Sequence, residues 1–158
     1  MLSGTVFISS CKKDKTAPAA TITATIDGTA VNFNTHAVAI KGSGETAGVT
    51  VIEGAGANGT TFSISFVSPL TAGKTFSSDA DDANNVPLLQ YSTASDDFIN
   101  ADIDQGDPFS VTITSVSSTS VQGTFKGKIA NEIIVAGNGT PSKIETITNG
   151  KFSVNFQN

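Results

Sequence analysis

The chain has 158 residues, with nine basic residues, fourteen acidic residues and a net charge of −5. This length suits one domain with a core of its own, and a single cysteine excludes an internal disulfide. The acidic balance argues against nucleic acid as a partner, because nucleic-acid binding needs clustered cations, and no stretch approaches the roughly 20 apolar residues of a membrane-spanning helix.

Cys11 is the only cysteine, and it stands between a short apolar segment and the sequence Lys12-Lys13-Asp14-Lys15. The preceding Ile8-Ser9-Ser10 completes a lipobox, where a bacterial signal peptidase cuts after a diacylglycerol has been attached to the thiol. We therefore expect residues 1–11 to be a truncated lipoprotein signal segment, with the true translation start further upstream and Cys11 as the lipid-attachment site. The alternative is an ordinary buried thiol.

Residues 12–19 have the composition of a flexible tether, with charge, threonine, alanine and a proline but nothing to bury. Attachment to the membrane would then be through lipid alone. We expect residues 20–158 to form a single β-rich domain, because alternation with a period of two begins near Ala20 and continues almost throughout.

The first half of this domain predicts four strands. The Asp27-Gly28 pair predicts a two-residue hairpin turn after the first strand, since glycine accepts a positive φ. The apolar positions change parity near Asn34-Thr35, which predicts a bulge or bend. The residues expected on the apolar faces are Ile22, Ala24, Ile26, Val31, Phe33, Val38, Ile40, Val49, Val51, Phe62, Ile64 and Phe66.

The second half begins with a long polar loop over residues 68–85, which we expect to hold a short strand near residues 74–76. Strands then resume at 87–92 and 98–103, and the later ones carry alternating apolar residues. Gly123 and Gly127 share the apolar face of one of them, where small residues would admit a backbone or a large ring. The apolar residues expected inside are Phe109, Val111, Ile113, Val121, Phe125, Ile129, Phe152, Val154 and Phe156, with residues 133–136 apolar on both faces.

About nine short strands at hairpin spacing, with no 3.6-residue stripe, predict an all-β fold. An antiparallel β-sandwich is the first choice and a flattened β-barrel is the alternative.

The order of these pieces resembles small Bacteroidota lipoproteins classed as a domain of unknown function. The resemblance is carried by the lipobox with KKDK, the early ATIDGTAVNF, the central PLTAGKTF and YSTAS, and the late VTITSVSSTSVQGTFKGKI and ITNGKFSVNF. It implies an envelope location, as an outer-membrane lipoprotein facing either the periplasm or the surface, and a β-rich fold. It implies no particular activity.

Histidine-based chemistry has only His36 to use. We interpret His36 as a strand-end residue rather than a catalytic base, because its position shares a face with Val38 and Ile40. No G-x-S-x-G elbow is present, and transition-metal sites of the usual kind need several His or Cys ligands. We therefore assign no catalytic residue.

Carboxylates are the one enriched reactive group, and they gather in two segments. Ca²⁺ prefers six to eight oxygen ligands, and the closest linear match to a calcium loop is residues 100–106, although its glycine is one place late and Val111 replaces the bidentate glutamate. Alternatively, Asn100, Asp102 and Asp104 form the solvent face of an edge strand. The first segment holds Asp79, Asp81 and Asp82; the second holds Asp96, Asp97 and the speculative calcium ligands Asp102, Asp104 and Asp107.

These observations favour a non-enzymatic cell-envelope lipoprotein that acts as a binding or structural module for a protein or glycan of unknown identity. We expect no cofactor, with calcium as the open alternative. Two other classes remain: a hydrolase that uses aspartates of the 79–107 region, and a calcium-stabilised adhesin-like domain. A hydrolase requires two of these carboxylates to converge in a cleft, whereas a binding module does not.

Overall fold

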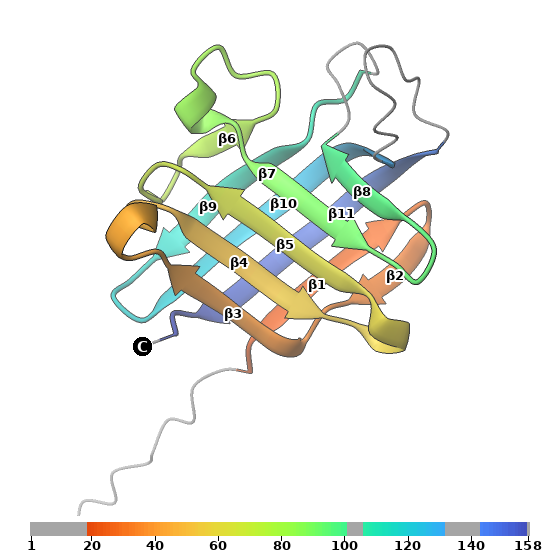
Figure 1. Cartoon of the computed structure of the whole chain (residues 1–158), viewed down its shortest axis with the longest axis horizontal. Coiled ribbons are helices and arrows are strands. Elements are labelled where there is room, and N and C mark those ends of the chain that lie inside the picture. Colours follow the sequence, from red (N-terminus) through yellow and green to blue (C-terminus); the bar gives the residue numbers. More distant parts are fainter. Residues whose placement is uncertain (1–18, 101–105, 132–142, 158) are drawn as a thin grey trace, which may run out of the picture.

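The computed structural model describes residues 19–100, 106–131 and 143–157. Within these ranges the chain forms eleven strands and three short 3₁₀ turns, and the expectation of an all-β, antiparallel architecture is confirmed (Figure 1). The strands are β1 (Thr21–Ile26), β2 (Thr29–Asn32), β3 (Thr35–Lys41), β4 (Thr50–Ala55), β5 (Thr61–Phe66), β6 (Thr75–Ser77), β7 (Leu88–Ser92), β8 (Asp97–Asn100), β9 (Ser110–Val116), β10 (Ser120–Asn131) and β11 (Ile144–Asn155).

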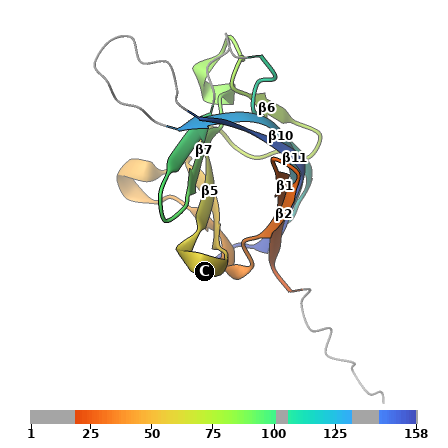
Figure 2. The same cartoon turned by 90° about the vertical axis from the view of Figure 1, so that its right-hand side faces the viewer.

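Nine of these strands follow one another in a single sheet in the order β2-β1-β11-β10-β8-β7-β5-β4-β3. The remaining two, β6 and β9, pair with each other, and β9 also pairs with the first half of β10. The sheet curls into a half-barrel, so that β5 and β7 face β10, β11 and β1 across the interior (Figure 2).

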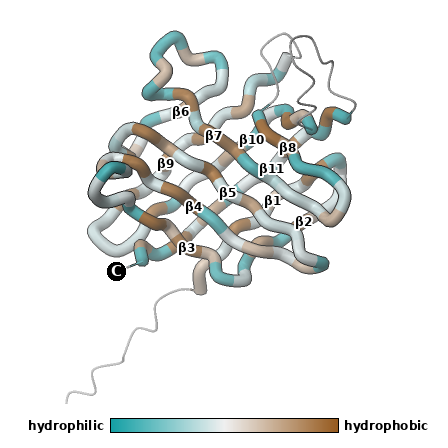
Figure 3. The backbone as a smooth tube through the Cα atoms, viewed as in Figure 1, coloured by the Kyte–Doolittle hydropathy of each residue, from teal (hydrophilic) through white to brown (hydrophobic). Residues whose placement is uncertain are grey.

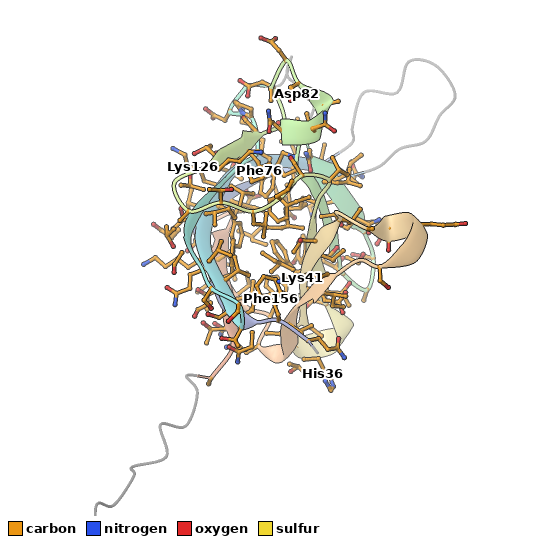
Figure 4. The ribbon with its side chains drawn as sticks, turned by 90° about the vertical axis from the view of Figure 1, so that its left-hand side faces the viewer. His36, Lys41, Phe76, Asp82, Lys126 and Phe156 are labelled. Carbon is orange, nitrogen blue, oxygen red and sulfur yellow. The ribbon has the colours of Figure 1, made fainter. Side chains whose placement is uncertain are left out.

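The β3 end of this path meets the segment that follows β11. Ala39 of β3 forms an isolated parallel bridge with Phe156, and the Gln157 N–H donates to the Ala39 carbonyl over 2.8 Å. The Lys41 Nζ lies 3.9 Å from the centroid of the Phe156 ring, which covers the same end of the half-barrel (Figure 4). The last residues of the chain thus join β3 to β11.

Aromatic rings connect the two layers of the core. Phe33 stacks on Phe62 with 5.0 Å between ring centroids, and Phe62 lies 5.0 Å from Phe125. Phe33 also meets the edge of Tyr91, which stacks on Phe98. Burial of such rings is a main source of stability in a domain without disulfides.

Hydropathy follows this arrangement along the chain. Brown and pale segments alternate along the strands in Figure 3, as expected where successive side chains point to opposite faces, and the loop after β6 is largely teal. Phe62, Ile64 and Phe66 of β5 are each at most 1 % exposed, which confirms the inward face predicted for that strand. The short strand expected near residues 74–76 is also present, as β6.

The prediction of which residues face the core is wrong in β3 and β4. Ala39 and Ile52 are fully buried, whereas Val38, Ile40 and Val51 are only half-buried and lie on the outer face. The cause is an irregular register between Thr35 and Val38, where His36 has a φ of 54°. An irregularity close to the predicted bulge therefore exists, but the inward positions stay odd-numbered, from Phe33 to Ala39, and do not shift to Val38 and Ile40.

Candidate functional site

Three of the four predicted site residues, Cys11, Asp102 and Asp104, lie outside the described residues. The fourth, Asp107, is exposed at a turn with a φ of 47°. Its carbonyl accepts from the Lys128 N–H, and its carboxylate lies 3.9 Å from the Lys128 Nζ. In residues 19–100, 106–131 and 143–157, no three His, Cys, Asp or Glu side chains gather into a group that could hold a metal ion.

The first acidic segment shapes its own loop. Asp82 accepts from the Asn84 backbone N–H over 3.0 Å and from the side-chain amides of Asn84 and Asn85. Asp79 accepts from the Ser77 hydroxyl. These bonds are typical of a turn in which an aspartate satisfies nearby backbone and amide groups.

His36 and this acidic loop lie far apart. Figure 4 places His36 at one extreme of the molecule and Asp82 at the other. His36 instead borders an open groove of about 330 Å³ on the outer face, together with Glu53 of β4 and Gln90 of β7. It is therefore not placed to act with the carboxylates of residues 79–82.

The part of the second acidic segment that the structure describes as a strand, β8, is not at an edge of the sheet. β8 pairs with β7 on one side and with the end of β10 on the other, so the edge-strand interpretation of Asn100 is wrong. The Asn100 side chain accepts from the Leu89 N–H over 2.7 Å and donates to the Pro87 carbonyl. Asn100 thus acts as a structural bridge between β7 and β8.

A site that the sequence did not suggest lies where β7, β8, β10 and β11 meet. Tyr91 is opposite Phe98, and Phe98 is opposite Asn131. Asn131 in turn exchanges hydrogen bonds with Lys143, through its N–H to the Lys143 carbonyl and from the Lys143 N–H to its side chain. Residues directly opposite each other point to the same face of a sheet. The side chains of Tyr91, Phe98, Asn131 and Lys143 therefore form one row, on the inner face at one open end of the half-barrel, which we call its mouth.

Glu145 lies in the next row, opposite the fully buried Ile129. Its side chain is only 12 % exposed, and its Oε1 lies 2.7 Å from the Lys143 Nζ. The same ammonium lies 3.6 Å from Asp96 and 5.0 Å from the centroid of the Phe98 ring. The hydrogen bond that the Lys143 ammonium donates to Glu145 raises the pKa of Lys143 more than any other interaction does.

Tyr91 closes the inner side of this cluster and is 7 % exposed. Burial raises the pKa of its phenol; the negative charge of Glu145 raises it further, and the positive charge of Lys143 opposes them. No group among the described residues forms a hydrogen bond with the Tyr91 hydroxyl. The described side chains therefore leave the donor and acceptor capacity of this hydroxyl unused.

We name Tyr91, Asp96, Phe98, Lys143 and Glu145 the mouth cluster. It combines two carboxylates, an aromatic face, one ammonium and one free hydroxyl, a set suited to holding a cation. The pair Lys143-x-Glu145 has the spacing of one strand face, which is a signal in the sequence. Its meaning depends on β7 and β8, about 50 residues away, so the residues alone could not identify it.

A scan against models of protein families, a search of the curated proteins and a search of the solved structures each give no match to this chain. None of the described helices is long and apolar enough to cross a membrane. The resemblance to Bacteroidota lipoproteins stays a prediction.

Proposed function

We propose that this chain is a lipoprotein of the bacterial cell envelope, attached through Cys11, whose β domain is a non-enzymatic binding module. The lipobox at residues 8–11 supports the attachment, and the mouth cluster supports the binding role. The proposal places the domain at an outer-membrane surface, with the mouth cluster available to a ligand or partner.

The relative positions of Thr21 and the mouth cluster are the observation that most supports a binding module exposed on an anchored domain. The chain enters the domain at Thr21, which pairs with Ser153 of β11, while Glu145 lies at the other end of the same strand (Figure 1). Eight residues of extended strand separate Ser153 from Glu145, a span of roughly 25 Å. A tether that leads into Thr21 would therefore hold the mouth cluster away from the anchoring surface.

Three of the aspartates considered for hydrolysis already have partners within the domain, which supports binding over hydrolysis. Asp79 and Asp82 accept hydrogen bonds within their own loop, and Asp96 is paired with Lys143. A glycoside hydrolase needs two carboxyl groups separated by about 5 to 10 Å across a substrate, one of them free to move a proton. Non-catalytic recognition requires no such pair.

Fractionation of a Bacteroidota host that expresses the full-length precursor tests the anchor. We expect the protein in the membrane fraction and Cys11→Ala in the soluble fraction, because two or more acyl chains hold a protein firmly. Thr16→Ala, in the tether, is the matched control and should stay with the membranes. An unmodified Cys11 in the intact mass of the host-made protein would overturn the proposal.

A further inference from the structure

The Lys143 ammonium lies in a site that is built for a cation. It lies 2.7 Å from Glu145, 3.6 Å from Asp96 and 5.0 Å above Phe98. Without this lysine the cluster would carry two negative charges beside an aromatic face, an arrangement that attracts organic cations. Lys143 therefore supplies the charge that this site requires.

The site is held more firmly than the side chain that fills it. Glu145 extends from β11, which is paired with β10 at this position and is bonded to Asp27 at the next residue. Asp96 is fixed by a tight turn in which its N–H donates to the Thr93 hydroxyl over 2.9 Å. The Lys143 side chain, in contrast, is 48 % exposed, and only its backbone is bonded to Asn131. Lysine has a long flexible stem, so Lys143 can leave the site without disturbing the strands.

The unpartnered Tyr91 hydroxyl is a second, independent indication of a ligand. Tyr91 is more than nine-tenths buried, and its phenol responds to the charges of both Glu145 and Lys143. A ligand with a hydrogen-bond donor or acceptor can bond to this hydroxyl, which no described residue uses. The mouth cluster therefore offers more bonding capacity than Lys143 uses.

We propose that the mouth cluster binds a primary alkylammonium group of a ligand, and that Lys143 occupies this position until the ligand displaces it. Lys143 is itself an alkylammonium, so its contacts show that a group of this charge and shape fits. Ca²⁺ does not match, because it needs six to eight oxygen ligands and gains nothing from a ring face. This inference rests on the proposed binding role and is independent of the lipid anchor.

Chemical rescue of Lys143→Ala in the full chain tests the proposal. n-Butylammonium chloride reproduces the lysine side chain, n-butanol is its neutral counterpart, and sodium chloride controls for ionic strength. We expect n-butylammonium to raise the melting temperature of Lys143→Ala saturably by at least about 2 °C beyond either control. The fluorescence of Tyr91, the only tyrosine in a chain without tryptophan, should change with the same saturation curve.

Two further variants make the result specific. Lys151→Ala removes an exposed lysine from β11, the strand that begins directly after Lys143, and should show no extra response to n-butylammonium. Lys143→Ala combined with Glu145→Gln should lose the rescue. An equal response in Lys143→Ala and Lys151→Ala, or a rescue that survives Glu145→Gln, would overturn the inference. Fractionation of the Cys11 variants decides the envelope proposal separately, so the two failures can be told apart.

Discussion

Phe152 of β11 lies directly across from Gly123 of β10, and its ring occupies the space that a side chain at position 123 would need. A Cβ atom built at Gly123 would lie 2.3 Å from the Phe152 Cζ and 2.7 Å from the Thr112 carbonyl oxygen. Gly127, further along β10, leaves similar room for the backbone of Pro108 and Phe109. The expectation that these two glycines admit a ring or a backbone is confirmed.

Gly123→Ala should lower the free energy of unfolding by about 1 to 3 kcal/mol, because the added methyl group overpacks a site bounded partly by backbone. Thr124→Ala, one residue later and exposed, should change it by no more than about 0.5 kcal/mol. Urea denaturation of both variants measures the difference. Equal midpoints would show that the core relaxes around position 123.

Phe62→Ala should destabilise the domain by about 3 to 5 kcal/mol, since Phe62 is 1 % exposed, stacks on Phe33 and contacts the tilted ring of Phe125. Such a loss is a large part of the usual margin of a domain of this size. Val67→Ala, at a side chain that is 53 % exposed, is the matched apolar control. Thermal melts that fail to separate the two variants would contradict the position assigned to Phe62.

Asn100→Ala should cost about 1 to 3 kcal/mol, because it leaves the Leu89 N–H and the Pro87 carbonyl without the bonds that Asn100 supplies. Asn155→Ala, at an exposed asparagine near the end of β11, serves as the comparison. Hydrogen exchange at the Leu89 amide should accelerate in Asn100→Ala alone. An unchanged exchange rate would refute the bridging role.

Tyr91 can be titrated by absorbance without interference, because it is the only tyrosine and the chain has no tryptophan. Burial raises the pKa of its phenol above the ordinary value near 10, so the folded protein should ionise at higher pH than the urea-unfolded chain. Glu145→Gln should lower this pKa, because it removes a negative charge, and Lys143→Ala should raise it. Two shifts in the same direction would contradict the geometry of the mouth cluster.

The raised pKa values of Tyr91 and Lys143 also determine how the stability of the fold changes at alkaline pH. The pKa values of Tyr91 and Lys143 are both raised in the folded state, so their contribution is complete below the unfolded values. It is lost as the pH rises above about 10, where the unfolded chain releases these protons first. Melting temperatures measured from pH 9 to 11 should fall more steeply for the wild type than for Glu145→Gln, because Glu145 raises both pKa values. Parallel curves would show that the charge of Glu145 adds nothing.

The sequence predicts best those strands in which only one face is apolar. In β5, serine and threonine alternate with Phe62, Ile64 and Phe66, so only one orientation buries the rings. Val38, Ala39 and Ile40 of β3 are apolar on both faces, and a period of two cannot decide between them. The left-handed backbone of His36 decides the orientation, and the pattern of apolar residues does not encode it.

The mouth cluster could not be predicted from the sequence for a different reason. Lys143 and Glu145 become neighbours of Tyr91 and Phe98 only because β8 pairs with the last residues of β10. Strand registers between segments so far apart depend on the whole sheet, and the spacing of charges along one strand does not report them. The expected edge at Asn100 was wrong for the same reason.

The position of β11 between β1 and β10 determines when the domain can assemble during synthesis. Thr21 pairs with Ser153, so the first strand has no partner on that side until almost the whole chain has been made. At about 5 to 20 residues per second, roughly 7 to 26 s separate the appearance of these two residues at the ribosome. Throughout that interval the nascent chain lacks its central strand. The curled sheet therefore cannot close before the last 15 residues of the domain have been made.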